Sequence, residues 1–300
     1  MILENLLKKA AYKVWKELKP INNPKFSIYE VREEALTSMA IKKMEKYNCG
    51  QIEKIEMIPP KLEKTAGYDF ELIIGSKAKG KFVRLFIQSK RLIGNKIKSN
   101  YTNLKLDLKQ TDQLLDYSKK HSSLGMYAFY NHLLENNLTL QNHYNSCSSF
   151  DKKSLGITLT SAYSVKKIKS NLFSDYHYNG GLRIDPMFYS LRHFPDLFYY
   201  HNGSKNHVAI PFHELSYFTI EKAEKINQLY NQIKKRNKKL NFFFFFPFGF
   251  EDFLEENEDL IPILNSSIEE LSQDFQNRTE KANDYFNPEA LIIIDTDETN

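Results

Sequence analysis

A short stretch of the chain, FVRLFIQSKRL from Phe82 to Leu92, begins like a buried strand and ends on polar side chains. Gln88 and Lys90 are two residues apart, and in a strand this spacing places both side chains on one face. Asp69 lies earlier in GYDFELII, whose alternation is typical of a strand. The glycine-containing segment GSKAKGK connects the two runs as a hairpin. The pattern therefore predicts Asp69 and Gln88 on neighbouring strands.

These residue types suit the hydrolysis of a phosphodiester, which needs a divalent cation, a positive charge for the phosphate and an activated water. A hard cation, Mg²⁺ or Mn²⁺, prefers oxygen ligands. Asp69 offers a carboxylate, Gln88 an amide oxygen and Ser89 a backbone carbonyl. Lys90 could approach the attacking water and the phosphate oxygens. Each residue alone is more often an ordinary surface or turn residue, so the hypothesis depends on their occurring together.

The surrounding elements predict an α/β protein. Apolar spacing favours helices over 1–19, 28–47 and 103–121, and strands over 51–58, 67–74, 81–90 and 125–132. This order is typical of a sheet that contains a hairpin and is flanked by helices. We divide the chain into an N-terminal helix (1–27), a core (28–135) and a C-terminal extension (136–300).

The C-terminal extension has weaker patterns. Residues 208–220 are predicted as a strand, 221–239 as a helix, and the phenylalanine-rich run 240–250 as a buried strand. Ser267 and Glu270 have the spacing of a capping box, which predicts the start of another helix. The acidic end of the chain, 295–300, is expected to fray.

Composition narrows the function classes. The 300 residues are 41% hydrophobic and 14% aromatic, enough for a sizeable core. The net charge of +5 permits an acidic partner such as nucleic acid. The two cysteines, Cys49 and Cys147, cannot form a disulfide framework, which fits the cytoplasm. No run has the length of a membrane span and the N-terminus lacks a signal-peptide pattern, so no membrane partner is expected.

The order of Asp69, Gln88 and Lys90 resembles the PD-(D/E)xK, or restriction-endonuclease-like, nuclease superfamily. FIQSKR is similar to the Q-x-K variant of Mrr-type restriction enzymes and archaeal Holliday-junction resolvases. Residues 28–135 resemble more closely an uncharacterised bacterial family within that superfamily. Gln88 replaces the commoner acid, which removes one negative charge and should loosen the metal. Tyr68 stands where the superfamily pattern has a proline. The resemblance implies a mixed central sheet flanked by helices, with a C-terminal α+β elaboration.

The superfamily usually places a glutamate of the first core helix near the metal. Helical phase, at about 100° per residue, puts Glu33 on the side of Leu36 and Ala40 that would pack on the sheet. Glu33 is therefore the expected third ligand, and Glu34 is the reserve.

Other residues are candidates for supporting roles. QLLDY resembles a helix signature of RecB-like nucleases and places Gln113 and Tyr117 on one face. Gln110 is the alternative, because it matches a glutamine of the narrower family. Glu71 shares the strand face of Asp69, either as a second ligand or as the partner of a nearby lysine.

Basic residues are expected to surround the proposed site, where they would neutralise phosphates and make binding sensitive to salt. They are Lys77, Lys79, Lys81, Arg84, Arg91, Lys96 and Lys98. We expect Arg84, Arg91 and Lys96 to contact nucleic acid, DNA rather than RNA.

We therefore expect a Mg²⁺-dependent (or Mn²⁺-dependent) endonuclease that hydrolyses DNA. The resemblance implies a bacterial role in restriction or anti-phage defence, and it is compatible with a homodimer or a partner defence subunit. The alternative is a catalytically inactive nucleic-acid-binding or protein-interaction module on the same fold. Binding of nucleic acid without metal-dependent cleavage would indicate the nucleic-acid-binding module. No binding of nucleic acid at low salt would indicate the protein-interaction module.

Overall fold

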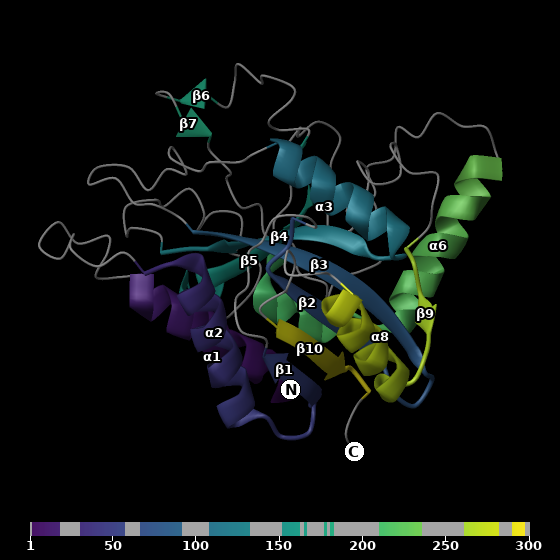
Figure 1. The fold of residues 1–300 in the computed structure, drawn as a ribbon, viewed down its shortest axis with the longest axis horizontal. Coiled ribbons are helices and arrows are strands. Elements are labelled where there is room, and N and C mark those ends of the chain that lie inside the picture. The colour runs from purple at the N-terminus through teal and green to yellow at the C-terminus, as the bar shows by residue number, and fades with distance from the viewer. Residues whose placement is uncertain are drawn as a thin grey trace, which may run out of the picture.

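The computed structural model describes residues 2–18, 31–57, 67–91, 108–132, 152–162, 165–166, 177–178, 181–182, 210–235, 261–281 and 290–297. It confirms the α/β prediction, with a mixed sheet flanked by helices (Figure 1). The predicted strand over 240–250 and the two lysines Lys96 and Lys98 lie outside the described residues.

In the part of the chain that the structure describes, the main sheet has eight strands. Seven of them lie in the order β1-β10-β2-β3-β4-β5-β8, while β9 pairs with β3. These strands are β1 (Ile52–Met57), β2 (Phe70–Ser76), β3 (Lys81–Arg91), β4 (Leu124–Tyr130), β5 (Ile157–Ser161), β8 (Ile210–Pro211), β9 (Leu264–Asn265) and β10 (Ala290–Asp295). A separate two-stranded sheet pairs β6 (His177–Tyr178) with β7 (Gly181–Leu182). The predicted hairpin is confirmed, because β2 and β3 are antiparallel neighbours.

Strand β10 comes from the C-terminal end of the chain and lies inside the sheet, between β1 and β2 (Figure 1). It runs antiparallel to β1 and parallel to β2. Its apolar side chains are buried on both faces, as expected of a central strand. The sheet that carries Asp69 and Gln88 therefore includes strands from both sides of residue 135.

The helices pack on both faces of this sheet. Among the described residues they are α1 (Ile2–Leu18), α2 (Glu33–Tyr47), α3 (Leu108–Lys120), α6 (Ile220–Lys235) and α8 (Ile268–Lys281), with the 3₁₀ helices η1 (Lys152–Gly156) and η5 (Phe212–Tyr217). The predicted capping box is confirmed at the start of α8. There the Ser267 amide donates to the Glu270 carboxylate, and the Glu270 amide donates to the Ser267 hydroxyl.

The predicted strand over 208–220 is wrong beyond Pro211. Phe212, Leu215 and Phe218 are buried at intervals of three residues, which is the period of a 3₁₀ helix. Within 210–220, the part of this segment that the structure describes, pairing with the sheet is limited to Ile210–Pro211.

Side-chain alternation along β3 separates two faces of the sheet. Ser89 contacts Thr37 of α2 on one face, whereas Gln88 contacts Gln110 of α3 on the other. Helix α8 covers the face of Gln88 further along the sheet, where Phe275 packs in a cluster with Phe82. None of the helices in the described ranges is long and apolar enough to cross a membrane.

Candidate active site

Asp69 and Gln88 face each other across the hairpin, as the sequence predicts. Asp69 immediately precedes β2, and its backbone amide donates to the carbonyl of Ile87 at 2.8 Å. The Gln88 side-chain amide donates from Nε2 to both carboxylate oxygens of Asp69, at 3.0 and 2.9 Å. The backbone amide of Ser89 adds a donor to Oδ2 at 2.6 Å. The Asp69 carboxylate is thus held in a defined position.

Gln110, on the first turn of α3, extends this contact into a chain that ends at Lys90. Its Nε2 donates to Gln88 Oε1 at 2.8 Å, and its Oε1 accepts from Lys90 Nζ at 3.1 Å. Asp69 and Gln88 are buried, whereas Gln110 and Lys90 are half-buried. This series of hydrogen bonds therefore connects the buried Asp69 carboxylate to the Lys90 ammonium, which has some access to solvent.

A glycine before Asp69 allows α3 to approach so closely. Gly67 has a φ of +71°, a conformation that glycine adopts without the penalty of a side chain. A Cβ at this position would lie 2.7 Å from the backbone oxygen of Gln110. The close contact between the backbone at Gly67 and the first turn of α3 helps to position Gln110 against Gln88.

Glu33 also lies at the end of β3, on the α2 side. Its Oε1 accepts a hydrogen bond from the Arg91 backbone amide at 3.1 Å. One turn later, Thr37 lies 2.6 Å from the Tyr130 hydroxyl and 3.4 Å from that of Ser89. Glu33 is therefore next to the Gln88–Lys90 segment, but the structure gives it no hydrogen bond to the side chains of Asp69, Gln88, Gln110 or Lys90.

The reserve candidate, Glu34, is placed differently. Its Oε2 is buried without a hydrogen-bond partner among the described residues. The structure gives no contact between Glu34 and Asp69.

The oxygen atoms around Gln88 fit a hard cation. Gln88 Nε2 lies among three oxygens, the two of the Asp69 carboxylate and, at 3.3 Å, the backbone carbonyl of Ser89. Such carboxylate and carbonyl oxygens are the ligands that Mg²⁺ and Mn²⁺ prefer. No group of three or more His, Cys, Asp or Glu side chains suited to a metal occurs in the described part of the chain. A cation here would be held by the Asp69 carboxylate with amide and carbonyl oxygens, and Glu33, at the end of β3, is the candidate second carboxylate.

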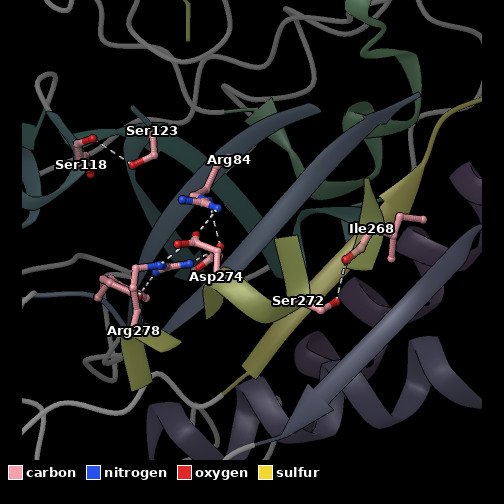
Figure 2. Close-up of polar contacts among 9 residues, drawn as sticks. Arg84, Ser118, Ser123, Ile268, Ser272, Asp274 and Arg278 are labelled. Atoms are coloured by element: carbon pink, nitrogen blue, oxygen red, sulfur yellow. Dashed lines mark hydrogen bonds and ion pairs between the residues drawn. The ribbon is translucent and has the colours of Figure 1, made fainter. Parts of the chain in front are cut away.

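A second polar cluster lies further along the same face and contains Glu71. Arg278 of α8 donates from one nitrogen to both Glu71 carboxylate oxygens, at 3.0 and 2.9 Å. Arg84 Nε lies 3.0 Å from Glu71, an ion pair without hydrogen-bond alignment. Asp274 accepts from Arg84 at 2.6 Å and from Arg278 at 3.1 Å, as Figure 2 shows. The cluster links α8 to β2 and β3.

Burial and charge act in opposite directions in this cluster. Complete burial raises the pKa of Glu71 above its ordinary value, against the opposing effect of Arg278 and Arg84. Partial burial would raise the pKa of Asp274, but the same two guanidinium groups leave it below its ordinary value. Burial would lower the pKa of Arg278, but Glu71 and its neighbours raise it. Burial and the two arginines lower the pKa of nearby His121.

These contacts bear on two open predictions. Among the described residues, Glu71 is neither bonded to Asp69 nor paired with a lysine, and Arg278 and Arg84 are the charged groups paired with it. Arg84 is only 5% exposed and its guanidinium binds two carboxylates, so the expected contact with nucleic acid is not supported. Sequence reasoning missed Arg278 and Asp274, and their i, i+4 spacing within α8 gave no sign of a partner on a distant strand.

On α3, the structure distinguishes the two glutamine candidates. Gln110 is bonded to Gln88, whereas Gln113 is half-buried one turn later. Tyr117 packs against aromatic rings, with its centroid 5.5 Å from that of Tyr68 and 5.1 Å from that of Phe86. Tyr117 therefore belongs to the packing between α3 and the sheet.

The hairpin lysines lie at the other end of β3 from Lys90. Lys77, Lys79 and Lys81 form ion pairs with Glu53, Glu221 and Glu224, respectively. The expectation that these lysines surround the site is wrong, because the turn and the site are at opposite ends of the same strand pair. Arg91, at the site end of β3, is half-buried and its guanidinium donates to the Val31 carbonyl.

Comparison with known proteins places the chain in a family but does not indicate a function. Residues 3–248 match the family described as a family of unknown function, DUF6615. Because this match covers most of the 300 residues, the chain belongs to that family. No curated protein gives a significant match.

Proposed function

We propose that the protein is a Mg²⁺-dependent nuclease of the restriction-endonuclease-like superfamily that hydrolyses phosphodiester bonds, with DNA as the expected substrate. One observation carries the proposal. Three oxygen atoms of Asp69 and Ser89 converge on the Gln88 amide nitrogen, and Lys90 lies on the same face one strand repeat away. This arrangement combines a hard-cation ligand set with a cation for the phosphate.

Each residue then has a definite role. Asp69, the Gln88 amide oxygen and Glu33 are the proposed ligands of the cation, and the Ser89 carbonyl would add a fourth oxygen. The metal, when bound, makes its water more acidic and neutralises charge on the phosphate. Lys90 stabilises the negative charge that develops on the phosphate oxygens. The backbone amide of Ser89 already donates to the Asp69 carboxylate, so little reorganisation of Asp69 itself is required.

Nucleic-acid binding would involve the end of β3 where Lys90 and Arg91 lie, both half-buried. The net charge of +5 supports weak attraction to a polyanion. A role in bacterial restriction or anti-phage defence, in the cytoplasm and with a second copy or a defence partner, belongs to the same proposal through the resemblance of FIQSKR to Q-x-K nucleases.

A second candidate is an inactive nucleic-acid-binding or protein-interaction module on the same fold. It is favoured by the Gln88 amide, which donates to both oxygens of Asp69 and so satisfies this carboxylate without a cation. A polar network that is complete by itself can serve stability alone.

The distinguishing experiment incubates purified protein with supercoiled plasmid, linear duplex, single-stranded DNA and RNA, with Mg²⁺, with Mn²⁺ or with a chelator. We expect cleavage that requires a metal ion and is faster on DNA than on RNA. Binding at low salt without cleavage would favour the inactive nucleic-acid-binding module. The absence of both would favour the protein-interaction module.

Gln88→Glu is expected to strengthen metal binding. Without metal, the new carboxylate faces Asp69 and loses the amide donors, so the apo protein should be less stable. With a cation, the added negative charge should lower Kd. Thermal unfolding measured with and without Mg²⁺ should therefore show a larger Mg²⁺-dependent stabilisation in Gln88→Glu, by about 1 kcal/mol, than in the wild type. An equal or smaller stabilisation would argue against Gln88 as a ligand.

A further inference from the structure

The hydrogen-bond chain from Lys90 to Asp69 has a fixed direction. An ammonium group can only donate, and an ionised carboxylate can only accept. The two amides between them must therefore each present an oxygen toward Lys90 and a nitrogen toward Asp69. The structure has this arrangement, with Lys90 donating to Gln110, Gln110 to Gln88, and Gln88 to Asp69. If one glutamine reversed its amide alone, its nitrogen would point at another donor and its oxygen at another acceptor. Both of its hydrogen bonds in this series would then be lost.

A cation bound at Asp69 demands the opposite orientation of the first amide. Gln88 would have to present its Oε1, and its Nε2 would then face Gln110. Gln110 would have to reverse as well, which would turn its own Nε2 toward the ammonium of Lys90. Two donors would then face each other, so the hydrogen bond between Lys90 and Gln110 could not persist.

We propose that Gln110 is a positioning residue that couples the cation site to Lys90. The Gln88 and Gln110 amides reverse together when a cation binds at Asp69, and this reversal releases the Lys90 ammonium for the substrate phosphate. The inference rests on the proposed function, since it requires a cation at Asp69. It adds a second reason why Lys90 weakens cation binding. Besides the repulsion of the two positive charges, the hydrogen bond from Lys90 to Gln110 holds both amides in the orientation that does not bind a cation.

A double-mutant cycle on metal affinity tests this coupling without substrate. Mn²⁺ binding is measured by electron paramagnetic resonance for the wild type, Lys90→Met, Gln110→Met and the double variant, after thermal unfolding has confirmed that each is folded. Lys90→Met should lower the Mn²⁺ Kd about tenfold in the wild-type background but only about twofold in Gln110→Met, because the amide link is already broken. Gln113→Met, on the same helix, is the matched control and should leave the tenfold effect unchanged.

Side-chain amide NMR gives a second readout. In a Mg²⁺ titration, the NH₂ signals of Gln88 and Gln110 should shift together with one midpoint, while that of Gln113 stays in place. Equal effects of Lys90→Met in both backgrounds, or a shift of Gln88 alone, would overturn the coupling. Wild-type protein that binds no Mn²⁺, or binds it equally after Asp69→Asn, would instead overturn the cation site and with it the proposed function.

Discussion

Replacing Lys90 with methionine is expected to lower the rate of metal-dependent DNA cleavage about 10²–10³-fold, the usual cost of removing a group that stabilises transition-state charge. Methionine keeps the length of the side chain but removes the ammonium that lies 3.1 Å from Gln110. The measurement is single-turnover cleavage of a labelled duplex at saturating Mg²⁺, which separates the chemical step from product release.

The matched control for this variant is Lys119→Met, at the exposed end of α3. Lys119→Met also removes one positive charge, and Lys119 lies on α3, the helix that carries Gln110, but at its far end. We expect it to leave the cleavage rate unchanged. DNA affinity at fixed salt should fall only slightly in Lys90→Met, because one phosphate contact among several is lost. Equal cleavage rates for Lys90→Met and Lys119→Met would remove Lys90 from the mechanism.

Replacing Arg278 with methionine should destabilise the fold by about 3–5 kcal/mol, as expected when one partner of a buried ion pair is removed. Glu71 is 0% exposed and receives both of its shortest hydrogen bonds from Arg278. Without this arginine, the carboxylate retains among the described residues only the Arg84 ion pair, in which Nε is not aligned for a hydrogen bond. Urea unfolding measures the loss.

The double variant Glu71→Met with Arg278→Met separates an unpaired charge from a simple loss of packing. Because the buried charge is removed together with its partner, stability should recover by about 2 kcal/mol or more relative to Arg278→Met alone. If Arg278→Met costs less than about 1 kcal/mol, the cluster in Figure 2 contributes little to holding α8 on the sheet.

The parts of this fold that the sequence predicts are those set by local patterns. Alternation and two glycines indicate β2, the turn and β3, and the antiparallel register then places Asp69 opposite Gln88. Strand β10 could not be placed in this way. A short apolar run identifies a buried strand at most, and its insertion between β1 and β2 depends on pairings far apart in the sequence.

The same limit applies to the charged residues of the site. Arg84 follows the alternation of β3, which indicates its face but not that Asp274 and Glu71 would bind it there. The hairpin lysines are close to Lys90 in sequence, yet an extended strand of 11 residues separates their positions by about 30 Å. Gln110 was one of two candidates on α3, and only the placement of the helix start beside Gly67 distinguishes it from Gln113.

The most direct test of the metal site compares the cleavage rate of wild type and Asp69→Asn across a range of Mg²⁺ concentrations, with both proteins purified in parallel. Asparagine has nearly the same shape, but it removes the only carboxylate bonded to Gln88 and Ser89 in the described structure. We predict wild-type cleavage that saturates with Mg²⁺ and stops with a chelator, and a rate at least about 10²-fold lower for folded Asp69→Asn at every concentration. Cleavage by Asp69→Asn at the wild-type rate, or wild-type cleavage that persists in chelator, would contradict the account.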